Sequence, residues 1–302
     1  MKSFEIGVIL PGVGEQRTRG LDLREAARHA EDAGLDGVWH GDHLAIGAPT
    51  LDASIALATA AAVTSRIRIG ASVFVPAIRP LAWVAKQVAS LQHVSGGRLV
   101  LGVGSGGGPG QWAAAGVAYG RRGRRTDTAL ELLPELLAGK ETRLPDEPGQ
   151  PPVTLSPAAA MPPVWVGNAS EAAIRRAARL GEGWFPSLIS PLEVAEGRAR
   201  LAELAGQAGR PVPVVAIGCA AALGGGPDVP SRAQVASGIS AGYGRPLEDV
   251  LPIPLTGHPE EAAGRLNDYR AAGASHAVVG ISGGDWRRQV DLLAEVRTLL
   301  HG

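Results

Sequence analysis

The chain has 302 residues, 45% of them hydrophobic and 19% charged, and its 29 basic residues balance its 29 acidic residues. This length allows a sizeable core, and the charge balance argues against a nucleic-acid partner. The one tight basic cluster, at 121–125, is expected to be a solvated helix start. A single cysteine, Cys219, argues against internal disulfides and multi-cysteine metal sites. Without a signal-peptide cleavage site or a membrane-length apolar stretch, we expect a cytoplasmic protein.

Strand-like apolar runs alternate with helix-period segments along the chain. Short apolar or β-branched runs predict strands at 4–10, 37–40, 67–73, 99–103, 164–166, 183–185, 214–217 and 276–279. Apolar residues at helical spacing predict helices at 21–33, 51–64, 81–91, 121–137, 170–180, 192–208, 260–272 and 285–300. Strands that are each followed by a helix indicate a parallel sheet. At this length we expect an α/β protein with a closed (β/α)8 TIM barrel, and a doubly wound open sheet is the alternative.

Two segments interrupt this alternation. Residues 139–162 are rich in proline, and residues 222–256 are rich in glycine. Both are too long for ordinary connections. We expect them to be insertions at the carboxyl-terminal mouth of the barrel, where active sites are built. Disordered surface decoration is the alternative for part of 222–250.

Glycine is unusually dense directly after the strand at 99–103. Glycines stand at 102, 104, 106, 107, 108 and 110, and a charged helix follows. Without Cβ atoms, backbone N–H groups approach a ligand closely, and a strand, a glycine turn and a helix form a common phosphate site. The alternative is a flexible surface loop.

A second turn of this kind follows the strand at 164–166. Gly167 and Asn168 end the strand, and Ser170 occupies the position of a helix cap. The free N–H groups of that helix point at whatever lies above Asn168, so the two turns together predict a grip on one phosphorylated ligand. A plain capped helix is the alternative. No G-x-G-x-x-G follows the first strand, which argues against an NAD-type site.

The second strand ends in the sequence WHGDHL, which predicts Trp39, Asp42 and His43 at the mouth. An imidazole there can donate a proton or hydrogen-bond a ligand, and a loop hydrogen bond between Asp42 and His43 is the alternative. We expect His93 to cap a helix end and His29 to be solvated. No histidine pair has metal-ligand spacing, so we expect no metal. The chain also has no G-x-S-x-G, which argues against an α/β-hydrolase.

Three blocks of the chain resemble the luciferase-like monooxygenase superfamily of flavin- and coenzyme F420-dependent enzymes. They are GLDGVWHGDHL at 34–44, RIRIGASVFVPAIRPLAWVAKQVASLQHVSGGRLVLGVGSG at 66–106 and PPVWVGNASEAAIRRAARLGEGWF at 162–185. The resemblance implies one TIM-barrel domain over residues 1–302, with an isoalloxazine or deazaflavin ring at its mouth.

The resemblance also implies roles for single residues. Asp42 matches the residue that contacts the ring system, and His43 matches the active-site histidine of the F420-dependent sugar-phosphate dehydrogenases. In the F420-dependent relatives the third strand ends in a non-proline cis peptide, and the matching bond here is Ser72–Val73. The cofactor-binding set that follows from the resemblance is Asp42, Ser72, Val73, Val75, Ser105, Gly106, Gly107, Gly110, Gly167, Asn168, Ser170 and Glu171.

A departure from the sugar-phosphate dehydrogenases argues against that particular activity. Gly107 stands where the sugar-phosphate dehydrogenases have a glutamate, and their phosphate-holding basic residues find no match. We therefore expect an F420-dependent oxidoreductase that moves hydride to or from another small organic substrate. The alternatives are an FMN-dependent monooxygenase and a non-catalytic flavin-binding barrel. We expect neither nucleic acid nor a membrane as a partner, and a homodimer stays open.

Overall fold

Eight parallel strands close into a barrel in the computed structural model of the protein, which describes residues 3–302. Around the barrel they follow the order β1 (Glu5–Ile9), β2 (Gly37–His40), β3 (Arg68–Ala71), β4 (Leu99–Val103), β7 (Val164–Gly167), β8 (Gly183–Phe185), β9 (Val214–Leu223) and β11 (His276–Ile281). The barrel closes because β11 pairs with β1 and β8 pairs with β9, all in parallel. This confirms the expected barrel, and the open-sheet alternative is wrong.

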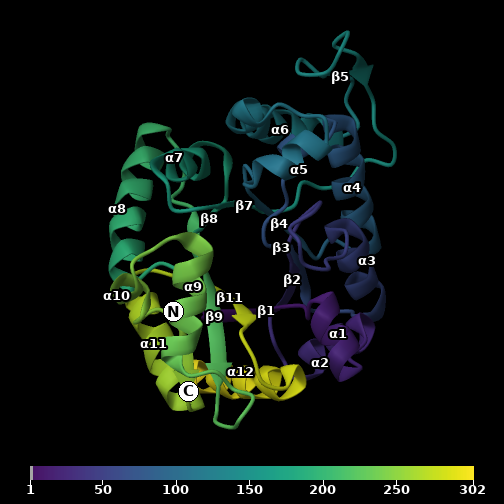
Figure 1. The fold of residues 1–302 in the computed structure, drawn as a ribbon. Helices are drawn as coiled ribbons and strands as arrows, with labels where there is room; N and C mark the ends of the chain where they lie inside the picture. Colours follow the sequence, from purple (N-terminus) through teal and green to yellow (C-terminus); the bar gives the residue numbers. More distant parts are fainter. Residues whose placement is uncertain (1–2) are drawn as a thin grey trace.

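Helices surround the strands (Figure 1). The helices that follow barrel strands are α2 (Leu23–Asp32), α3 (Ala53–Val63), α4 (Leu81–Val94), α6 (Arg122–Leu137), α7 (Glu171–Leu180), α8 (Pro191–Gln207), α11 (Pro259–Ala271) and α12 (Trp286–His301). The smaller elements are α1 (Val13–Arg19), η1 (Pro76–Ile78), α5 (Pro109–Ala114), η2 (Tyr119–Arg121), β5 (Thr142–Arg143), β6 (Pro152–Val153), α9 (Arg232–Tyr243), α10 (Leu247–Val250) and β10 (Leu255–Gly257). Aspartate caps begin several helices: Asp22, Asp52 and Asp285 each accept a backbone N–H from the first turn.

Aromatic side chains fill the middle of the barrel. The rings of Trp39 and Trp165 stack with centroids 5.2 Å apart, and Phe185 packs against both. Glycines on neighbouring strands make room for them, because a Cβ at Gly70 or Gly183 would collide with Trp39 or Trp165 respectively. We call Trp39, Trp165 and Phe185 the aromatic floor. The expectation that Trp39 lies at the mouth is wrong: its side chain is buried inside the barrel.

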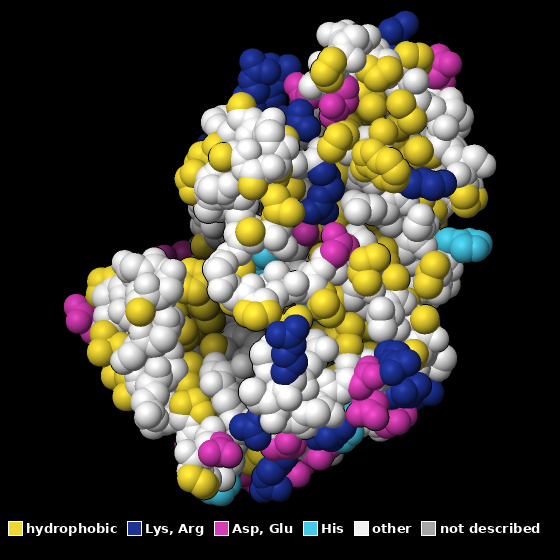
Figure 2. All heavy atoms as spheres, turned by 45° about the vertical axis from the view of Figure 1, so that its right-hand side comes forward, with side chains coloured by type: hydrophobic (Ala, Val, Ile, Leu, Met, Phe, Trp, Pro, Cys, Tyr) yellow, Lys and Arg dark blue, Asp and Glu magenta, His cyan; other side chains and the backbone are white. Residues whose placement is uncertain are grey.

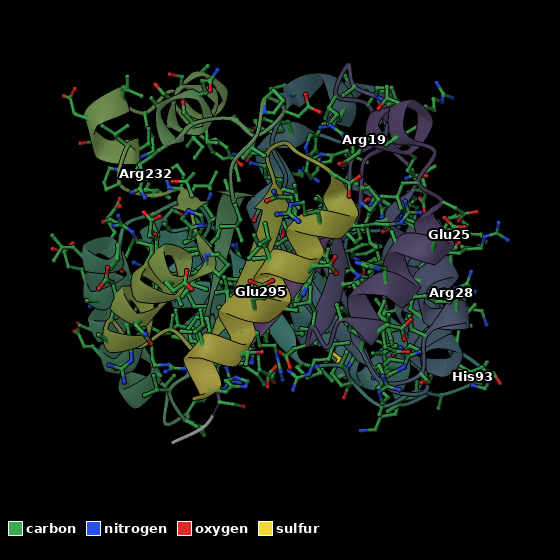
Figure 3. The ribbon with its side chains drawn as sticks, turned by 90° about the horizontal axis from the view of Figure 1, so that it is seen from below. Arg19, Glu25, Arg28, His93, Arg232 and Glu295 are labelled. Carbon is green, nitrogen blue, oxygen red and sulfur yellow. The ribbon has the colours of Figure 1, made fainter. Side chains whose placement is uncertain are left out.

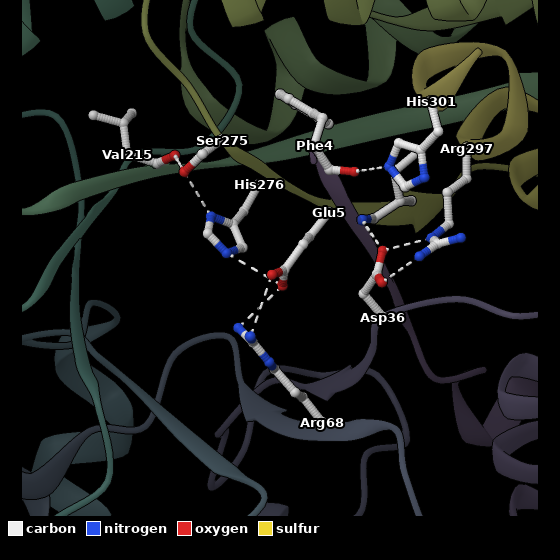
Figure 4. A network of polar contacts seen from close by, with 10 residues as sticks. Phe4, Glu5, Asp36, Arg68, Val215, Ser275, His276, Arg297 and His301 are labelled. Atoms are coloured by element: carbon white, nitrogen blue, oxygen red, sulfur yellow. Dashed lines mark hydrogen bonds and ion pairs between the residues drawn. The ribbon is translucent and has the colours of Figure 1, made fainter. Parts of the chain in front are cut away.

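Charged side chains form a network at the amino-terminal end of the barrel (Figure 4), and Glu5 and His276 share a small space with Trp39 and Trp165 of the aromatic floor. Glu5 pairs with Arg68 at 3.0 Å and with His276 at 3.3 Å, and Asp36 forms a double hydrogen bond with Arg297. The hydrogen bond from His276 is the main reason that the pKa of Glu5 lies below its usual value. His276 packs edge-on against the Trp165 ring, with centroids 4.9 Å apart, and the remaining space between network and floor is about 10 Å³, room for about one water.

The proline-rich segment at 139–162 lies outside the barrel. Its β5 and β6 form a small antiparallel pair that projects past α6 in Figure 1. The chain then returns along α4, where Lys86 donates to Ser156 O and Gln92 donates to Ala160 O.

The glycine-rich segment at 222–256 is folded. Strand β9 continues to Leu223 instead of ending at 217, and β10 pairs in parallel with it at Leu255 and Ala221. Between them α9 and α10 pack around a small apolar core that includes Val235, Ile239 and Val250. The alternative of surface disorder in part of 222–250 is therefore wrong.

Two histidines differ from their expected roles. His93 is exposed and points away from the protein without capping a helix (Figure 3). His29 is not simply solvated, because its Nε2 lies 2.8 Å from Asp291 Oδ1 and thereby links α2 to α12. Within residues 3–302, no helix combines the length and apolarity that a membrane crossing needs.

Candidate active site

A cavity of about 1270 Å³ opens at the carboxyl-terminal mouth, above the aromatic floor. Figure 2 shows a hollow in the molecular surface with hydrophobic side chains along its walls. The expected site residues that line the cavity are Asp42, His43, Ser72, Val73, Val75, Ser105, Gly106, Gly107, Gly167, Asn168 and Ser170. Two others do not line it: Gly110 lies in the first turn of α5, and Glu171 pairs with Arg175 and Arg200 on the surface.

The backbone after β3 bulges into this cavity. The Ser72–Val73 peptide bond is cis, as the family resemblance implies. Ser72 N donates to His40 O and Phe74 N donates to Gly102 O, so hydrogen bonds to both neighbouring strands hold the bulge. The side chain of Val73 points across β4 towards β7.

Several glycines of the two glycine-rich turns leave the space that this bulge occupies. A Cβ at Gly167 would lie 2.9 Å from Val73 Cγ1, and one at Gly104 would collide with Val73 Cγ2. At Gly106, where φ is +70°, a Cβ would lie 2.8 Å from Val75 Cγ1. Gly107 is different, because a Cβ there would meet no atom within 4 Å. The glycine density therefore reflects packing against β3 as well as space for a ligand.

A buried ion pair holds the segment after the bulge. Asp42 accepts a hydrogen bond from Val75 N at 2.9 Å through Oδ2, and its Oδ1 lies 2.8 Å from Arg79 Nη2. The Asp42 side chain is only 4% exposed, and Arg79 also lies over the Phe74 ring. Asp42 therefore fixes the Val75 backbone and the Arg79 side chain in the cavity wall. Sequence reasoning missed Arg79, because a contact between residues 37 positions apart leaves no periodic signal.

The insertion at 139–162 supports the same wall from outside. Glu147 accepts from Leu81 N at 3.2 Å and lies 3.5 Å from Arg125, whose guanidinium donates to Ala77 O and Arg79 O. No residue of this insertion lines the cavity, in contrast to Gly242, Tyr243 and Arg245 of the second insertion.

Three buried polar groups on the cavity wall have no hydrogen-bond partner within residues 3–302. They are Ser72 Oγ, Arg79 Nη1 and Trp112 Nε1. A buried polar group without a partner costs about 1–3 kcal/mol, so native proteins rarely leave one unpaired. Protein atoms cover all three, so a ligand in the cavity does not contact them, although their residues line it through other atoms.

Two arginines stand beside the glycine turns. Arg176 on α7 lies 2.6 Å from Asp127 and donates to Ser105 Oγ at 3.2 Å, which ties the two turns together. Arg122 at the start of α6 lies over the Tyr119 ring, and no carboxylate of the described residues lies within 4 Å of it. The prediction of a solvated helix start is wrong for Arg125, whose side chain is only 14% exposed, while Arg122 begins α6 and lines the cavity. The signal that could have found both is their position near the start of helices that begin at the mouth.

The second turn is shaped by Asn168. Its φ is +85°, its Oδ1 accepts from Ser170 N, and its carbonyl accepts from Trp184 Nε1 at 2.9 Å. The Ser170 side chain makes no cap hydrogen bond, so the first N–H groups of α7 stay available to an anion.

His43 stands on the rim of the cavity. Its side chain is exposed and has no hydrogen-bond partner in the described part of the chain. Gln111 Oε1 anchors the loop by accepting from Leu44 N and Ala45 N, at 2.8 and 3.2 Å. The neighbouring His40 is buried and donates through Nδ1 to Gly41 O, and burial lowers its pKa. Of the two, only His43 can reach a ligand in the cavity.

Comparison with known proteins agrees with this geometry. The luciferase-like monooxygenase family model matches residues 5–228, and the chain belongs to that family. An uncharacterised protein of Mycobacterium tuberculosis is 36% identical over 169 residues, which is 55% of this chain and 58% of that protein. The 4-hydroxyprotoasukamycin monooxygenase of Streptomyces nodosus is 36% identical over 126 residues, 40% of this chain and 34% of its own. An F420-dependent glucose-6-phosphate dehydrogenase of Amycolatopsis mediterranei is 31% identical over 184 residues, 54% and 52% of the two chains.

Solved structures share the fold. An F420-dependent secondary alcohol dehydrogenase, in complex with an F420-acetone adduct, superposes with a TM-score of 0.81 over 98% of both chains at 17% identity. The FMN-bound oxygenating constituent of 3,6-diketocamphane monooxygenase from Pseudomonas putida superposes with a TM-score of 0.73 over 97% of both chains at 14% identity. The predicted family and fold are both confirmed.

Proposed function

We propose that the protein is an oxidoreductase that uses a flavin-type cofactor, coenzyme F420, on a small organic substrate. The observation that carries the proposal is a cavity of about 1270 Å³ whose wall combines the backbone after β3, the glycine turn after β4 and the start of α7, where the Ser170 side chain makes no cap hydrogen bond. Glycine backbone admits a flat ring closely, and a helix N-terminus without a side-chain cap can accept a phosphate. Membership of a family whose named relatives include a dehydrogenase and a monooxygenase supports the same class of reaction.

In this proposal, different residues of the cavity would contact the ring, hold the phosphate and exchange a proton with the substrate. Backbone at Ser72–Val73 would contact the ring, and the glycine turn from Ser105 to Gly107 would hold the phosphate together with the N-terminus of α7 and Arg176. When bound, the cofactor supplies a ring atom that takes or gives a hydride. His43 would take or give the accompanying proton on the substrate's oxygen. The aromatic floor below keeps water away from the deeper face of the ring.

Charge at the mouth supports F420 over FMN. Both carry a phosphate, but F420 continues into an anionic glutamyl tail. Arg122 lacks a carboxylate neighbour and lies on the cavity wall near Gly123 and Arg176, so it can meet this additional charge. FMN-dependent monooxygenation is the second candidate, because one relative and one structural neighbour are named as monooxygenases.

Titration with F420, reduced F420 and FMN, followed by ring fluorescence, tests the proposal. We expect F420 to bind more tightly than FMN. Arg122→Gln should weaken F420 binding more than FMN binding, and the matched change Arg121→Gln, at an exposed position off the cavity wall, should alter neither. Tighter binding of FMN would favour the second candidate. If neither ring binds, the proposal is wrong.

A further inference from the structure

The loop between β2 and α3 is fixed at both of its ends but hardly in between. Just before it, the buried Asp42 is paired with Arg79 at 2.8 Å. Just after it, Asp52 caps α3 by accepting a hydrogen bond from Ile55 N at 3.1 Å. Residues 43–50 are all exposed and form no helix or strand. A segment with so few buried contacts opens easily, so its position depends on the hydrogen bonds that it makes.

One side-chain atom connects the middle of this loop to the rest of the protein. Gln111 Oε1, on α5, accepts from Leu44 N at 2.8 Å and from Ala45 N at 3.2 Å. Within the part of the chain that the structure describes, these two are the hydrogen bonds that residues 43–51 make with other segments. An amide oxygen has two lone pairs, so it can satisfy both N–H groups. Removing this oxygen would therefore release the middle of the loop.

Gln111 itself is firmly held, directly after the glycine turn that follows β4. Its N–H donates to Gly108 O at 3.0 Å, and a Cβ on Gly108 would lie 3.1 Å from its Nε2. The next residue, Trp112, is 1% exposed and packs with Val75 and Ala77. The Gln111 amide therefore lies between the loop and the turn that would hold the cofactor phosphate.

The loop carries His43 to the bulge after β3. A Cβ on Gly41 would lie 3.3 Å from His43 Nε2 and 3.7 Å from Ser72 O, so these two groups border the same small space. His43 and Ser72 both line the cavity. The imidazole therefore lies on the side of the cavity where the bulge would contact the cofactor ring.

We infer that Gln111 is a positioning residue for His43: its amide oxygen fastens the loop to the glycine turn, so the segment that would hold the cofactor phosphate also holds the imidazole beside the ring. This inference rests on the proposed function for the role of His43. The tether itself is present in the protein without a ligand.

Millisecond hydrogen–deuterium exchange, resolved to single amides, tests the tether in cofactor-free protein. Gln111→Met keeps the length of the side chain but removes the acceptor, so the N–H groups of Leu44 and Ala45 should exchange about fivefold faster than in the wild type. Gln111→Glu keeps an acceptor oxygen and should preserve the slow exchange. Gln16→Met is the matched control and should change neither amide, because Gln16 Nε2 donates to Pro11 O in a different loop. Equal exchange rates in all four proteins would overturn the inference.

Modification of His43 by diethyl pyrocarbonate, quantified by mass spectrometry, tests the positioning role. With F420 at about ten times the dissociation constant of each protein, modification of His43 should slow about tenfold in the wild type, since the unbound fraction is what reacts. In Gln111→Met the slowing should be less than about threefold, because a released loop leaves the imidazole reactive while the cofactor is bound. Gln111→Glu and Gln16→Met should behave like the wild type. His93, which is exposed and points away from the protein, is the internal reference.

Two results of this second experiment would overturn the inference. One is a wild-type protein in which bound F420 leaves the modification rate of His43 unchanged. The other is a Gln111→Met protein in which F420 protects His43 as well as it does in the wild type. Failure of both F420 and FMN to bind would contradict the proposed function, and exchange in the cofactor-free protein would still decide whether the Gln111 tether exists.

Discussion

Two adjacent glycines distinguish the packing role of the glycine-rich turn from its ligand role. At Gly106 the φ of +70° disfavours any side chain, and a Cβ would lie 2.8 Å from Val75 Cγ1 and 3.2 Å from Trp112 Cζ2. The left-handed backbone costs about 1–2 kcal/mol for alanine, and moving Val75 or Trp112 adds about 1 kcal/mol. Gly106→Ala should therefore lower the free energy of unfolding by about 2–3 kcal/mol, even without a ligand.

Gly107→Ala provides the contrast. Its Cβ would meet no protein atom within 4 Å, so the free energy of unfolding should stay within about 0.5 kcal/mol of the wild type. Because Gly107 lines the cavity, we expect the new methyl group to take space that the cofactor uses and to weaken cofactor binding about tenfold.

Urea denaturation followed by tryptophan fluorescence measures the first effect, and fluorescence titration with F420 measures the second. The reasoning fails if Gly106→Ala is as stable as the wild type. The placement of the cofactor against this turn fails if Gly107→Ala binds F420 with unchanged affinity.

Three further predictions concern the rim, the floor and the base of the barrel. His43→Ala should lower turnover about a hundredfold while cofactor affinity changes little, and steady-state kinetics beside a binding titration would reveal intact turnover if the role is wrong. Trp39→Ala should lower the free energy of unfolding by about 3–5 kcal/mol, measured in urea, because it removes a stacked ring from the buried floor. Glu5→Gln should be less stable than the wild type near neutral pH. Because the pKa of Glu5 is lowered in the folded protein, chiefly by the hydrogen bond from His276, this difference should shrink as the pH falls below 4.5; a difference that persists in acid contradicts it.

The barrel could be predicted because its strands and helices have clear periodic patterns. In strand β9, the periodic pattern predicted only the first half of the strand. Its second half, Gly218–Leu223, consists mainly of alanine and other small residues, which are compatible with a strand, a helix or a turn. Pairing with β11 from His276 to Ile281 decides the matter, and such long-range pairing has no local signature. The same reason explains why β10 and the helices α9 and α10 were not expected.

The candidate site likewise contains residues that the sequence predicted and residues that only the folded structure reveals. His43, Ser105 and Asn168 stand at strand ends, so topology alone places them at the mouth. Arg79, Gln111 and Glu147 act through contacts with residues more than 30 positions away, which only the folded chain reveals. The interpretation of the glycines was incomplete for the same reason, because the Val73 side chain that needs their space comes from another strand.

The aromatic floor also constrains the order in which two ligands bind and leave. Trp39, Trp165 and Phe185 block the interior, and the network around Glu5 occupies the opposite end. Every ligand must therefore enter and leave through one opening. A molecule resting on the floor has to arrive before the one that lies above it and cannot depart until that one has gone. In initial-rate kinetics, the deeper ligand should behave as the obligatory first reactant, and excess of the shallower one should slow its release.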